Sequence, residues 1–282
     1  MQSPSQMVIN CRGKLLDLSA RPVVMGILNV TPDSFYDGGS YIADKDAIRR
    51  RVEDILEQGA GIIDVGGCST RPGAADVTPE EEWQRLAVAF EIIQKYHPEV
   101  IVSVDTFRAS VAKRSVQEGG VSIINDISAG TLDKDLLPTV AELNVPYILM
   151  HIQGDPQTMQ QNPHYEDVTK DVILQLSNQL AEVRRLGIHD VIIDPGFGFG
   201  KTLEDNYKLM SDLEQFSVFE LPLLVGISRK SMIYKLLGTS PSEALNGSTI
   251  LNTVSIMKGA NILRVHDVKE AVECVNILKN IS

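Results

Sequence analysis

The sequence has little cysteine, no membrane-length apolar run and no leader-like start. Its three cysteines, Cys11, Cys68 and Cys274, are far apart in the 282 residues, and no CxxC pair occurs. Zinc knuckles and redox dithiols are therefore not indicated, and scattered reduced thiols are expected. No run of about 18 apolar residues occurs, which excludes a spanning helix. The first residues lack the apolar stretch of a signal peptide, so we expect a cytoplasmic protein.

Basic residues are also in deficit. Lys and Arg number 26 against 37 Asp and Glu, which gives a formal net charge of −11. Because phosphate polymers and anionic membranes require a basic footprint, this charge argues against broad binding to nucleic acid or to an anionic membrane. A small phosphate ligand needs only a local cluster of basic groups and stays compatible with this charge.

What the sequence does have is a regular alternation of short apolar runs and longer amphipathic segments. The runs are nearly continuous in Val, Ile and Leu, as in strands covered on both faces. They are residues 24–30, 62–66, 101–105, 122–126, 147–151, 190–194, 223–228 and 261–266. Apolar residues at helical spacing predict helices over 44–58, 79–96, 107–117, 136–144, 167–186, 203–215, 242–258 and 268–280, with Thr78 as one N-cap.

Eight strand–helix pairs predict an α/β fold, the (β/α)8 TIM barrel of about 250 residues. We expect one domain over residues 1–282, with the barrel proper at about 23–280. The segment 7–18 alternates weakly and predicts a short N-terminal β-hairpin over the barrel bottom. The rival is a doubly wound open sheet, which normally carries GxGxxG after its first strand. Here the first strand ends in NVTPD instead.

Nearly every apolar run ends in polar or charged residues. In chain order these are Asn29, the turn 66–71, Asp105, Asn125 with Asp126, His151, Asp194, the run Ser228-Arg229-Lys230, and Arg264 with His266. One such residue is often an ordinary cap, but eight successive strands favour an assembled polar pocket at the carboxyl ends. Asp and Asn side chains can pair with the edges of a pterin or purine, while Arg and His can hold phosphate oxygens.

Three loops complete the expected site. Residues 31–41 and 68–77 are long and mix Gly and Pro with reactive polar side chains, which favours a functional role over plain connection. The segment 194–201, DPGFGFGK, has the wrong glycine spacing for a Walker A loop. Phe197 and Phe199 could both simply plug the barrel top, but one of the two is expected to stack on a flat heterocycle. Lys230 suits a fixed cation better than a Schiff-base lysine, and the chain after it starts a helix.

These motifs resemble the dihydropteroate synthase family of the folate pathway. The matching stretches are MGILNVTPDSF (25–35), IDVGGCSTRPGA (63–74), SVDT (103–106), IINDIS (123–128), LMHIQGDPQTMQ (149–160), IIDPGFGFGK (192–201), LLVGISRKSMI (223–233) and LRVHDVKEAV (263–272). They stand in the family's order and cover nearly all of residues 25–280.

The resemblance implies a homodimeric barrel enzyme that uses Mg²⁺. It would condense 4-aminobenzoate with a dihydropterin carrying a hydroxymethyl diphosphate and release diphosphate. By this likeness Asn29 meets the metal, and the pterin is held by Asp105, Asn125, Asp194 and Lys230. The diphosphate is held by Thr70, Arg71, Arg264, Val265 and His266, and the aminobenzoate by Phe35, Pro72, Phe199 and Ser231. The catalytic roles fall to Asp105, Lys230 and Arg71.

The sequence differs from the family pattern at one position, and two alternative functions are compatible with parts of the motif set. The family commonly has Glu where this chain has Cys68, which puts a loop-anchoring role of that Glu in doubt. A corrinoid-dependent methyltransferase domain would share the pterin-reading Asp and Asn but needs no diphosphate clamp, which Thr70, Arg71, Arg264 and His266 indicate. A non-catalytic pterin-binding protein would be expected to lose parts of that clamp. A pyrophosphate-release assay discriminates among these functions.

Overall fold

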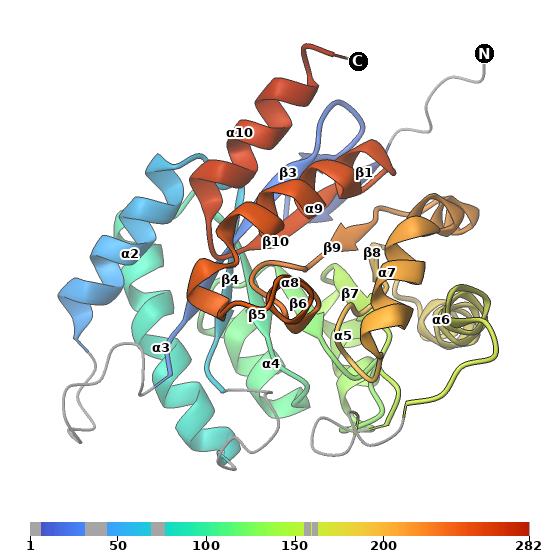
Figure 1. Cartoon of the computed structure of the whole chain (residues 1–282). Coiled ribbons are helices and arrows are strands. Elements are labelled where there is room, and N and C mark those ends of the chain that lie inside the picture. The colour runs from blue at the N-terminus through green and yellow to red at the C-terminus, as the bar shows by residue number, and fades with distance from the viewer. Residues whose placement is uncertain (1–6, 32–43, 69–76, 155–158, 160–162, 282) are drawn as a thin grey trace.

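The computed structural model describes residues 7–31, 44–68, 77–154, 159 and 163–281. Eight parallel strands form the centre, and helices surround them (Figure 1). The strands are β3 (Val23–Asn29), β4 (Ile62–Gly66), β5 (Ile101–Asp105), β6 (Ile123–Asp126), β7 (Tyr147–Met150), β8 (Val191–Asp194), β9 (Leu224–Val225) and β10 (Ile262–Val265). Their order in the sheet is β8-β7-β6-β5-β4-β3-β10-β9.

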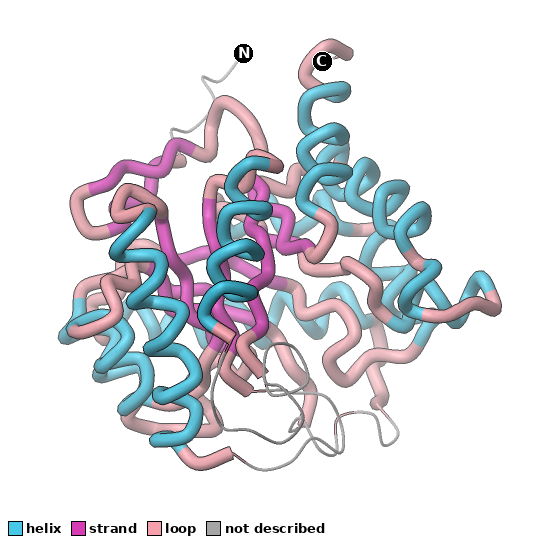
Figure 2. The backbone as a smooth tube through the Cα atoms, turned by 90° about the vertical axis from the view of Figure 1, so that its left-hand side faces the viewer, coloured by secondary structure: helices cyan, strands magenta, loops and turns pink. Residues whose placement is uncertain are grey.

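The sheet closes on itself between β8 and β9. Ile193 forms a parallel bridge with Leu223, and its N–H donates to the carbonyl of Pro222 at 2.9 Å. The predicted (β/α)8 barrel is therefore confirmed, and the open doubly wound sheet is excluded. Figure 2 shows the strands running together through the centre of the molecule with helices outside them. Closure brings the carboxyl ends of all eight strands to one rim.

The helices alternate with the strands close to the expected ranges. They are α2 (Lys45–Glu57), α3 (Pro79–Tyr96), α4 (Ala109–Gln117), α5 (Leu136–Leu143), α6 (Val168–Arg185), α7 (Leu203–Ser211), α8 (Ser231–Leu237), α9 (Leu245–Met257) and α10 (Val268–Leu278). The predicted N-cap Thr78 forms a capping box: its hydroxyl accepts from the N–H of Glu81 at 3.2 Å, and Glu81 accepts from the N–H of Thr78 at 2.9 Å.

Three elements differ from the expectation. The helix expected over 242–258 begins at Leu245, after the separate 3₁₀ helix η2 (Pro241–Glu243). The helix expected over 203–215 ends at Ser211 and is followed by the 3₁₀ helix η1 (Leu213–Phe219). Its buried residues recur every three positions, which is the period of a 3₁₀ helix. The seventh strand pairs over Leu224–Val225 only, because the chain turns at Ile227, whose carbonyl accepts from the N–H of Lys230.

The apolar interior forms two layers. A large layer lies between the strands and the surrounding helices. A smaller layer fills the amino end of the barrel and includes Met25, Ile62 and Ile123. The predicted hairpin, β1 (Val8–Cys11) and β2 (Lys14–Asp17), covers this end with Ile9 and Leu16. Within the described ranges, no helix is both long enough and apolar enough to cross a bilayer.

Candidate active site

Polar side chains from adjacent strands form a row across the carboxyl rim. The strand register pairs Asn29 with Gly66, Gly66 with Asp105, and Asp105 with Asn125. Because side chains alternate along a strand, these residues share the interior face with the apolar floor below them. A Cβ at Gly66 would lie 3.2 Å from Oδ1 of Asn29, so the glycine leaves room for that amide.

Arg264 of β10 reaches two carboxylates across the interior. Its Nε donates to Oδ2 of Asp64 at 2.6 Å, and its Nη2 donates to Oδ2 of Asp105 at 2.6 Å. Asn125 also donates to Oδ2 of Asp64, at 3.1 Å. Burial alone would lower the pKa of Arg264, but the carboxylates of Asp64 and Asp105 outweigh it and raise that pKa. The interior thus holds a permanently charged guanidinium between two acids.

Asp105 is the acid at the rim. Burial raises its pKa to about 7, against the opposing effect of Arg264, and the nearby charge of Asp64 adds to the increase. Its side chain is still 18% exposed, so a ligand entering the barrel mouth can reach it. The carboxyl group of Asp105 can therefore be reached by a ligand, and its raised pKa lies near neutral pH.

Asp194 and Lys230 lie on the β8–β9 side of the rim. Oδ1 of Asp194 accepts from the N–H of Gly196 at 2.7 Å. The ammonium of Lys230 donates to the carbonyl of Phe197 and lies 4.7 Å from the centre of the Phe199 ring. Burial raises the pKa of Asp194 and lowers that of Lys230 to about 8. Lys230 therefore lies beside an aromatic ring as a hydrogen-bond donor, but burial lowers its pKa, so the permanently charged cation expected from the sequence is not supported.

The loop 194–201 separates its two phenylalanines. Phe197 is fully buried in the outer apolar layer, whereas Phe199 is half-buried and packs against a small cluster that includes Ile127 and Met150. Gly196 has φ of +69°, and a Cβ there would lie 1.8 Å from the carbonyl oxygen of His151, so only glycine fits. Phe197 thus packs between strands and helices instead of plugging the barrel top, and Phe199 is the one placed for the stacking that stays a prediction.

The expectation that every polar strand end lines the pocket is wrong for Asp126 and His151. Asp126 accepts from the hydroxyl of Tyr147 at 2.6 Å and from the N–H of Gly130 at 2.6 Å. His151 bonds Gln175 of α6 through Nε2 at 3.0 Å. Strand alternation turns both side chains outward. The side chain of Val265 also lies in the outer layer, so only its main chain can meet a ligand.

His151 and Lys201 support the loop rather than act as a base. Burial and the charge of Lys201 lower the pKa of His151 to about 2, which keeps the imidazole neutral. With Nε2–H donating to Gln175, Nδ1 accepts from Lys201 at 2.9 Å. Lys201 also donates to the carbonyls of Gly196 and Phe199, at 2.8 and 3.2 Å. The buried lysine thereby fixes the loop that carries Phe199.

Some of the remaining predicted residues lie in the described part of the chain, and the others lie outside it. At the rim, Ser228 Oγ accepts from the N–H of His266 at 3.1 Å, and Ser231 starts α8 half-buried. Arg229 pairs with Asp267 at 2.8 and 2.9 Å and serves the scaffold. The other predicted residues lie outside the described part of the chain; these are Phe35, Thr70, Arg71 and Pro72.

Cys68 should not be a nucleophile. Burial raises its pKa to about 12, and the charge of Glu82 adds to that effect despite Arg108 at 3.9 Å from the sulfur. A protonated thiol is a poor nucleophile. We expect Cys68→Ser to retain kcat/KM within about threefold, which is less than about 1 kcal/mol of barrier. Steady-state kinetics measures this, and complete inactivation with an unchanged circular dichroism spectrum would contradict it.

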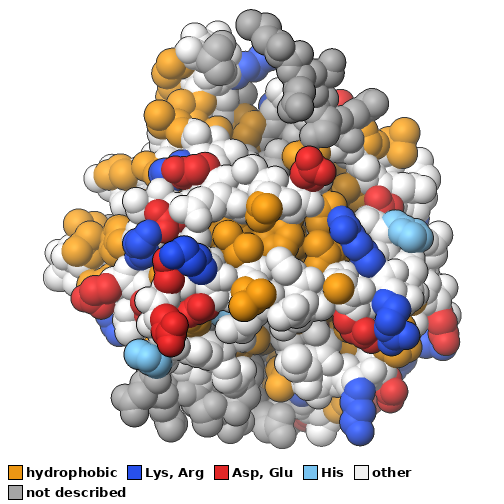
Figure 3. Space-filling model, turned by 90° about the vertical axis from the view of Figure 1, so that its right-hand side faces the viewer, with side chains coloured by type: hydrophobic (Ala, Val, Ile, Leu, Met, Phe, Trp, Pro, Cys, Tyr) orange, Lys and Arg blue, Asp and Glu red, His pale blue; other side chains and the backbone are white. Residues whose placement is uncertain are grey.

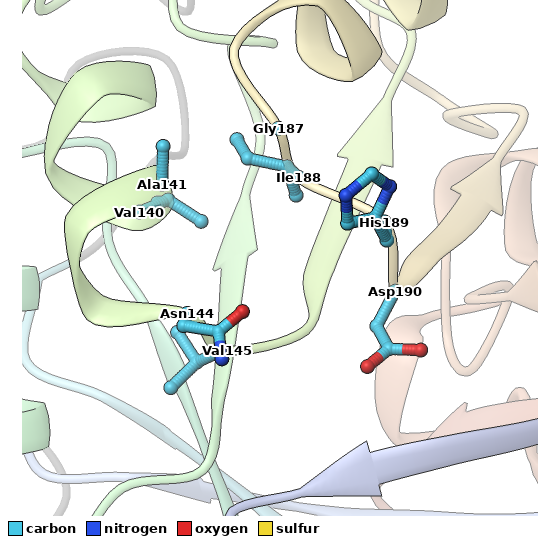
Figure 4. A pocket seen from close by; sticks show the side chains of 8 residues that line it. All are labelled: Val140, Ala141, Asn144, Val145, Gly187, Ile188, His189 and Asp190. Carbon is cyan, nitrogen blue, oxygen red and sulfur yellow. The ribbon is translucent and has the colours of Figure 1, made fainter.

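A small pocket lies at the other end of the barrel. It is formed where α5 ends and where the chain enters β7 and β8 (Figure 4), and it is lined by Val140, Ala141, Asn144, Val145, Gly187, Ile188, His189 and Asp190. These residues precede the strands, whereas barrel enzymes place their chemistry at the carboxyl ends. The interior cluster around Arg264 is therefore the better candidate site.

Sequence reasoning missed two residues of this site, Asp64 and Lys201. Asp64 interrupts the apolar run IIDVG, and it lies two residues before the strand end, on the same face as Gly66. A charged residue inside an otherwise apolar strand was the available signal. Lys201 had only its place at the end of the DPGFGFGK loop, which does not distinguish a buried lysine from an exposed one.

Fold and interior cluster together define a barrel enzyme with a site for a polar ring and an anion at its carboxyl rim. Comparison narrows this class. A sequence model of the family "Pterin binding enzyme" matches residues 25–266. The dihydropteroate synthase of Escherichia coli K12 is 48% identical over 275 residues, 97% of this chain and 96% of that protein.

Solved structures agree with the sequence comparison. A Yersinia pestis dihydropteroate synthase in complex with a sulfonamide drug superposes with a TM-score of 0.90 at 42% identity, covering 98% of each chain. A Xanthomonas albilineans dihydropteroate synthase with 4-aminobenzoic acid gives 0.89 at 37% identity, again over 98% of each chain. The chain belongs to the pterin binding enzymes and, within them, to the dihydropteroate synthases, which are transferases of folate synthesis.

Proposed function

We propose that this chain condenses 4-aminobenzoate with (7,8-dihydropterin-6-yl)methyl diphosphate to give 7,8-dihydropteroate and diphosphate. The observation that carries the proposal is the interior cluster in which Arg264 joins Asp64 and Asp105 beside Asn125. Such a cluster offers acceptors and donors to a pterin and a fixed cation to a leaving anion. The similar Escherichia coli protein is named dihydropteroate synthase, which denotes the same class of reaction.

The chemistry assigns separate roles to these groups. The C–O bond to the diphosphate breaks with its electron pair, and a cationic methylene conjugated with the pterin remains. Asp105 stabilises this cation, while Arg264 and His266 neutralise the departing charge. The arylamine nitrogen then attacks the methylene and releases a proton. Asn125, Asp194 and Lys230 hold the pterin. Because the arylamine itself is the nucleophile, the protein does not need to supply one.

Magnesium is part of the proposal, with Asn29 as its protein contact. An amide oxygen at the rim suits Mg²⁺, which prefers oxygen ligands and is commonly held by few protein groups together with substrate phosphates. Within the described ranges, no group of three or more His, Cys, Asp or Glu residues is placed to hold a metal ion. That agrees with an ion shared with the substrate. When bound, Mg²⁺ would supply charge neutralisation on the diphosphate.

The activity should depend on pH with a bell-shaped profile. Asp105 must be ionised, and its pKa is raised to about 7, so kcat/KM for the pterin substrate should rise with pH up to that value. Lys230 must be protonated, and its pKa is lowered to about 8, so kcat/KM should fall above it. Rates measured from about pH 6 to about pH 9 test this, and a flat profile would contradict it.

A pyrophosphate-release assay tests the function itself. With both substrates, the wild-type chain should release diphosphate and form dihydropteroate in equal amounts. Omitting the pterin diphosphate should abolish release, and omitting 4-aminobenzoate should reduce it to a small background. Release that ignores the arylamine would point to a hydrolase and contradict the synthase proposal.

A homodimer is the proposed assembly. Exposed apolar side chains gather on the consecutive helices α8, α9 and α10; these are Leu236, Leu237, Ile250, Met257 and Ile277. In α9 the buried residues include Ser248 and Asn252, while Ile250 is 54% and Met257 73% exposed. This inverted polarity favours a partner surface. Figure 3 shows a different side of the molecule, the right-hand side of Figure 1, where apolar side chains also lie between charged ones. Light scattering should give twice the mass of 31.0 kDa.

We also propose that the protein acts in the cytoplasm. Cys11, Cys68 and Cys274 are all free thiols. Burial raises the pKa of Cys11 to about 12, which keeps it protonated and unreactive. Unpaired thiols suit a reducing compartment.

A further inference from the structure

Asp64 is an acid in the middle of the barrel that the roles above leave unassigned. It lies in β4, faces the interior between Ile62 and Gly66, and is 0% exposed. A carboxylate without contact to water is costly unless charged or polar donors surround it. Its partners therefore indicate its purpose.

One oxygen of Asp64 joins three strands. Oδ2 accepts from Nε of Arg264 in β10 at 2.6 Å and from Nδ2 of Asn125 in β6 at 3.1 Å. Both donors come from residues proposed to contact substrate, one at the anion and one at the pterin. Asp64 thus lies behind two parts of the site that bind different ends of one molecule.

The first consequence concerns Arg264. Asp64 holds Nε while Asp105 holds Nη2, so two carboxylates fix the plane of the guanidinium. Within the described ranges these are its hydrogen bonds, which leaves the Nη1 group for a ligand. Without Asp64, only the contact to Asp105 would orient the group, and the side chain could rotate about it.

The second consequence concerns Asn125. Nδ2 of Asn125 donates to Oδ2 of Asp64, so the amide nitrogen of Asn125 faces Asp64. The amide oxygen then faces away, as an acceptor for a pterin N–H. Without that partner either end of the amide could face the ligand, and half of the orientations would present the wrong group.

We propose that Asp64 is a positioning residue that sets the guanidinium plane of Arg264 and the amide orientation of Asn125 together. It couples pterin recognition to the anion clamp without touching the reacting atoms. This inference rests on the proposed function, because the affected substrate is the pterin diphosphate. Misplacing either group by about 1 Å costs roughly tenfold to a hundredfold in rate.

The test is Asp64→Asn, which keeps the shape and removes the charge. We expect kcat/KM for the pterin diphosphate to fall roughly tenfold to a hundredfold, while the KM for 4-aminobenzoate stays within about twofold. A purely structural role would lower stability without this split between substrates. Ser103→Ala is the matched control: Ser103 faces the interior beside Asp64 in the register, and its Oγ has no hydrogen-bond partner among the described residues. That variant should behave as wild type.

A double-mutant cycle tests whether Asp64 acts through Arg264. In an Arg264→Ala background, Asp64→Asn should cost clearly less than it does in the wild-type chain, because only its effect through Asn125 remains, so the two losses should be less than multiplicative. Asp64→Glu, which keeps the charge but displaces the carboxylate, is the second variant and should lose activity as Asp64→Asn does. Thermal unfolding checks that each variant folds.

Two outcomes would overturn the inference: wild-type kinetics in Asp64→Asn, or losses that multiply in the double variant. Both leave the wild-type synthase activity intact. If instead the wild-type chain formed no dihydropteroate, the proposed function itself would fail. The two failures are therefore distinguishable in one set of assays.

Discussion

Arg264→Ala should reduce kcat/KM by roughly 10²–10³, or about 2.7–4 kcal/mol, the scale for losing one preorganised charge stabiliser. The guanidinium is held by Asp64 and Asp105 before any substrate arrives, so little reorganisation accompanies charge development. The loss should be larger for the diphosphate substrate than for 4-aminobenzoate. Steady-state kinetics with each substrate varied in turn measures it.

Stability needs a control in this experiment. Removing Arg264 leaves the buried Asp64 and the partly exposed Asp105 without their cation, which is destabilising. Arg264→Lys keeps a charge but loses the planar fork that contacts both carboxylates, so an intermediate loss is expected. Thermal unfolding of both variants separates folding from catalysis. An Arg264→Ala variant that folds and keeps kcat/KM within about threefold would contradict the assignment.

Asp105→Asn should lower kcat by about 10²-fold or more with little change in the KM for 4-aminobenzoate. The substitution preserves the shape and removes the charge. A carboxylate near a diphosphate is unfavourable for ground-state binding, but it becomes useful when positive charge develops on the pterin methylene. If Asp105 only bonds pterin nitrogens, the main effect should be a raised KM for the pterin substrate.

Asp194→Asn is the matched control for that experiment. Asp194 is also an acid at a strand end, but its Oδ1 is held by the N–H of Gly196, which suits a role in holding the pterin. We expect a raised KM for the pterin substrate with a smaller change in kcat. An unchanged kcat in Asp105→Asn would leave Asp105 as a binding residue.

The barrel could be predicted from the sequence because eight apolar runs alternate with helical segments. A closed eight-stranded sheet follows from this alternation along the whole chain and not from any single contact. The sequence predicted the site less completely. The position of a polar residue at the end of a strand does not show whether its side chain points into the barrel or outward. Asp126 and His151 were therefore grouped with the interior residues, although both point outward. Counting positions in twos from Ile123 in β6 would have placed Asn125 inside and Asp126 outside.

Contacts between distant segments were beyond prediction. Arg264 and Asp64 are 200 positions apart, and their ion pair exists because β10, β3 and β4 are neighbours in the closed sheet. The short β9 and the 3₁₀ turn η1 also depend on tertiary packing, because local spacing favoured a longer strand and a longer helix.

The residues that match the family model form a shorter segment than the residues that contribute to the stability of the fold. The family match runs from residue 25 to residue 266, whereas the hairpin β1–β2 lies before it and α10 after it. The hairpin covers the apolar floor, and α10 buries Val268, Ala271 and Val275. Each large apolar side chain uncovered by trimming would forfeit about 1.5–3 kcal/mol. Changes at either end, remote from every substrate, would therefore lower the amount of active enzyme rather than its turnover.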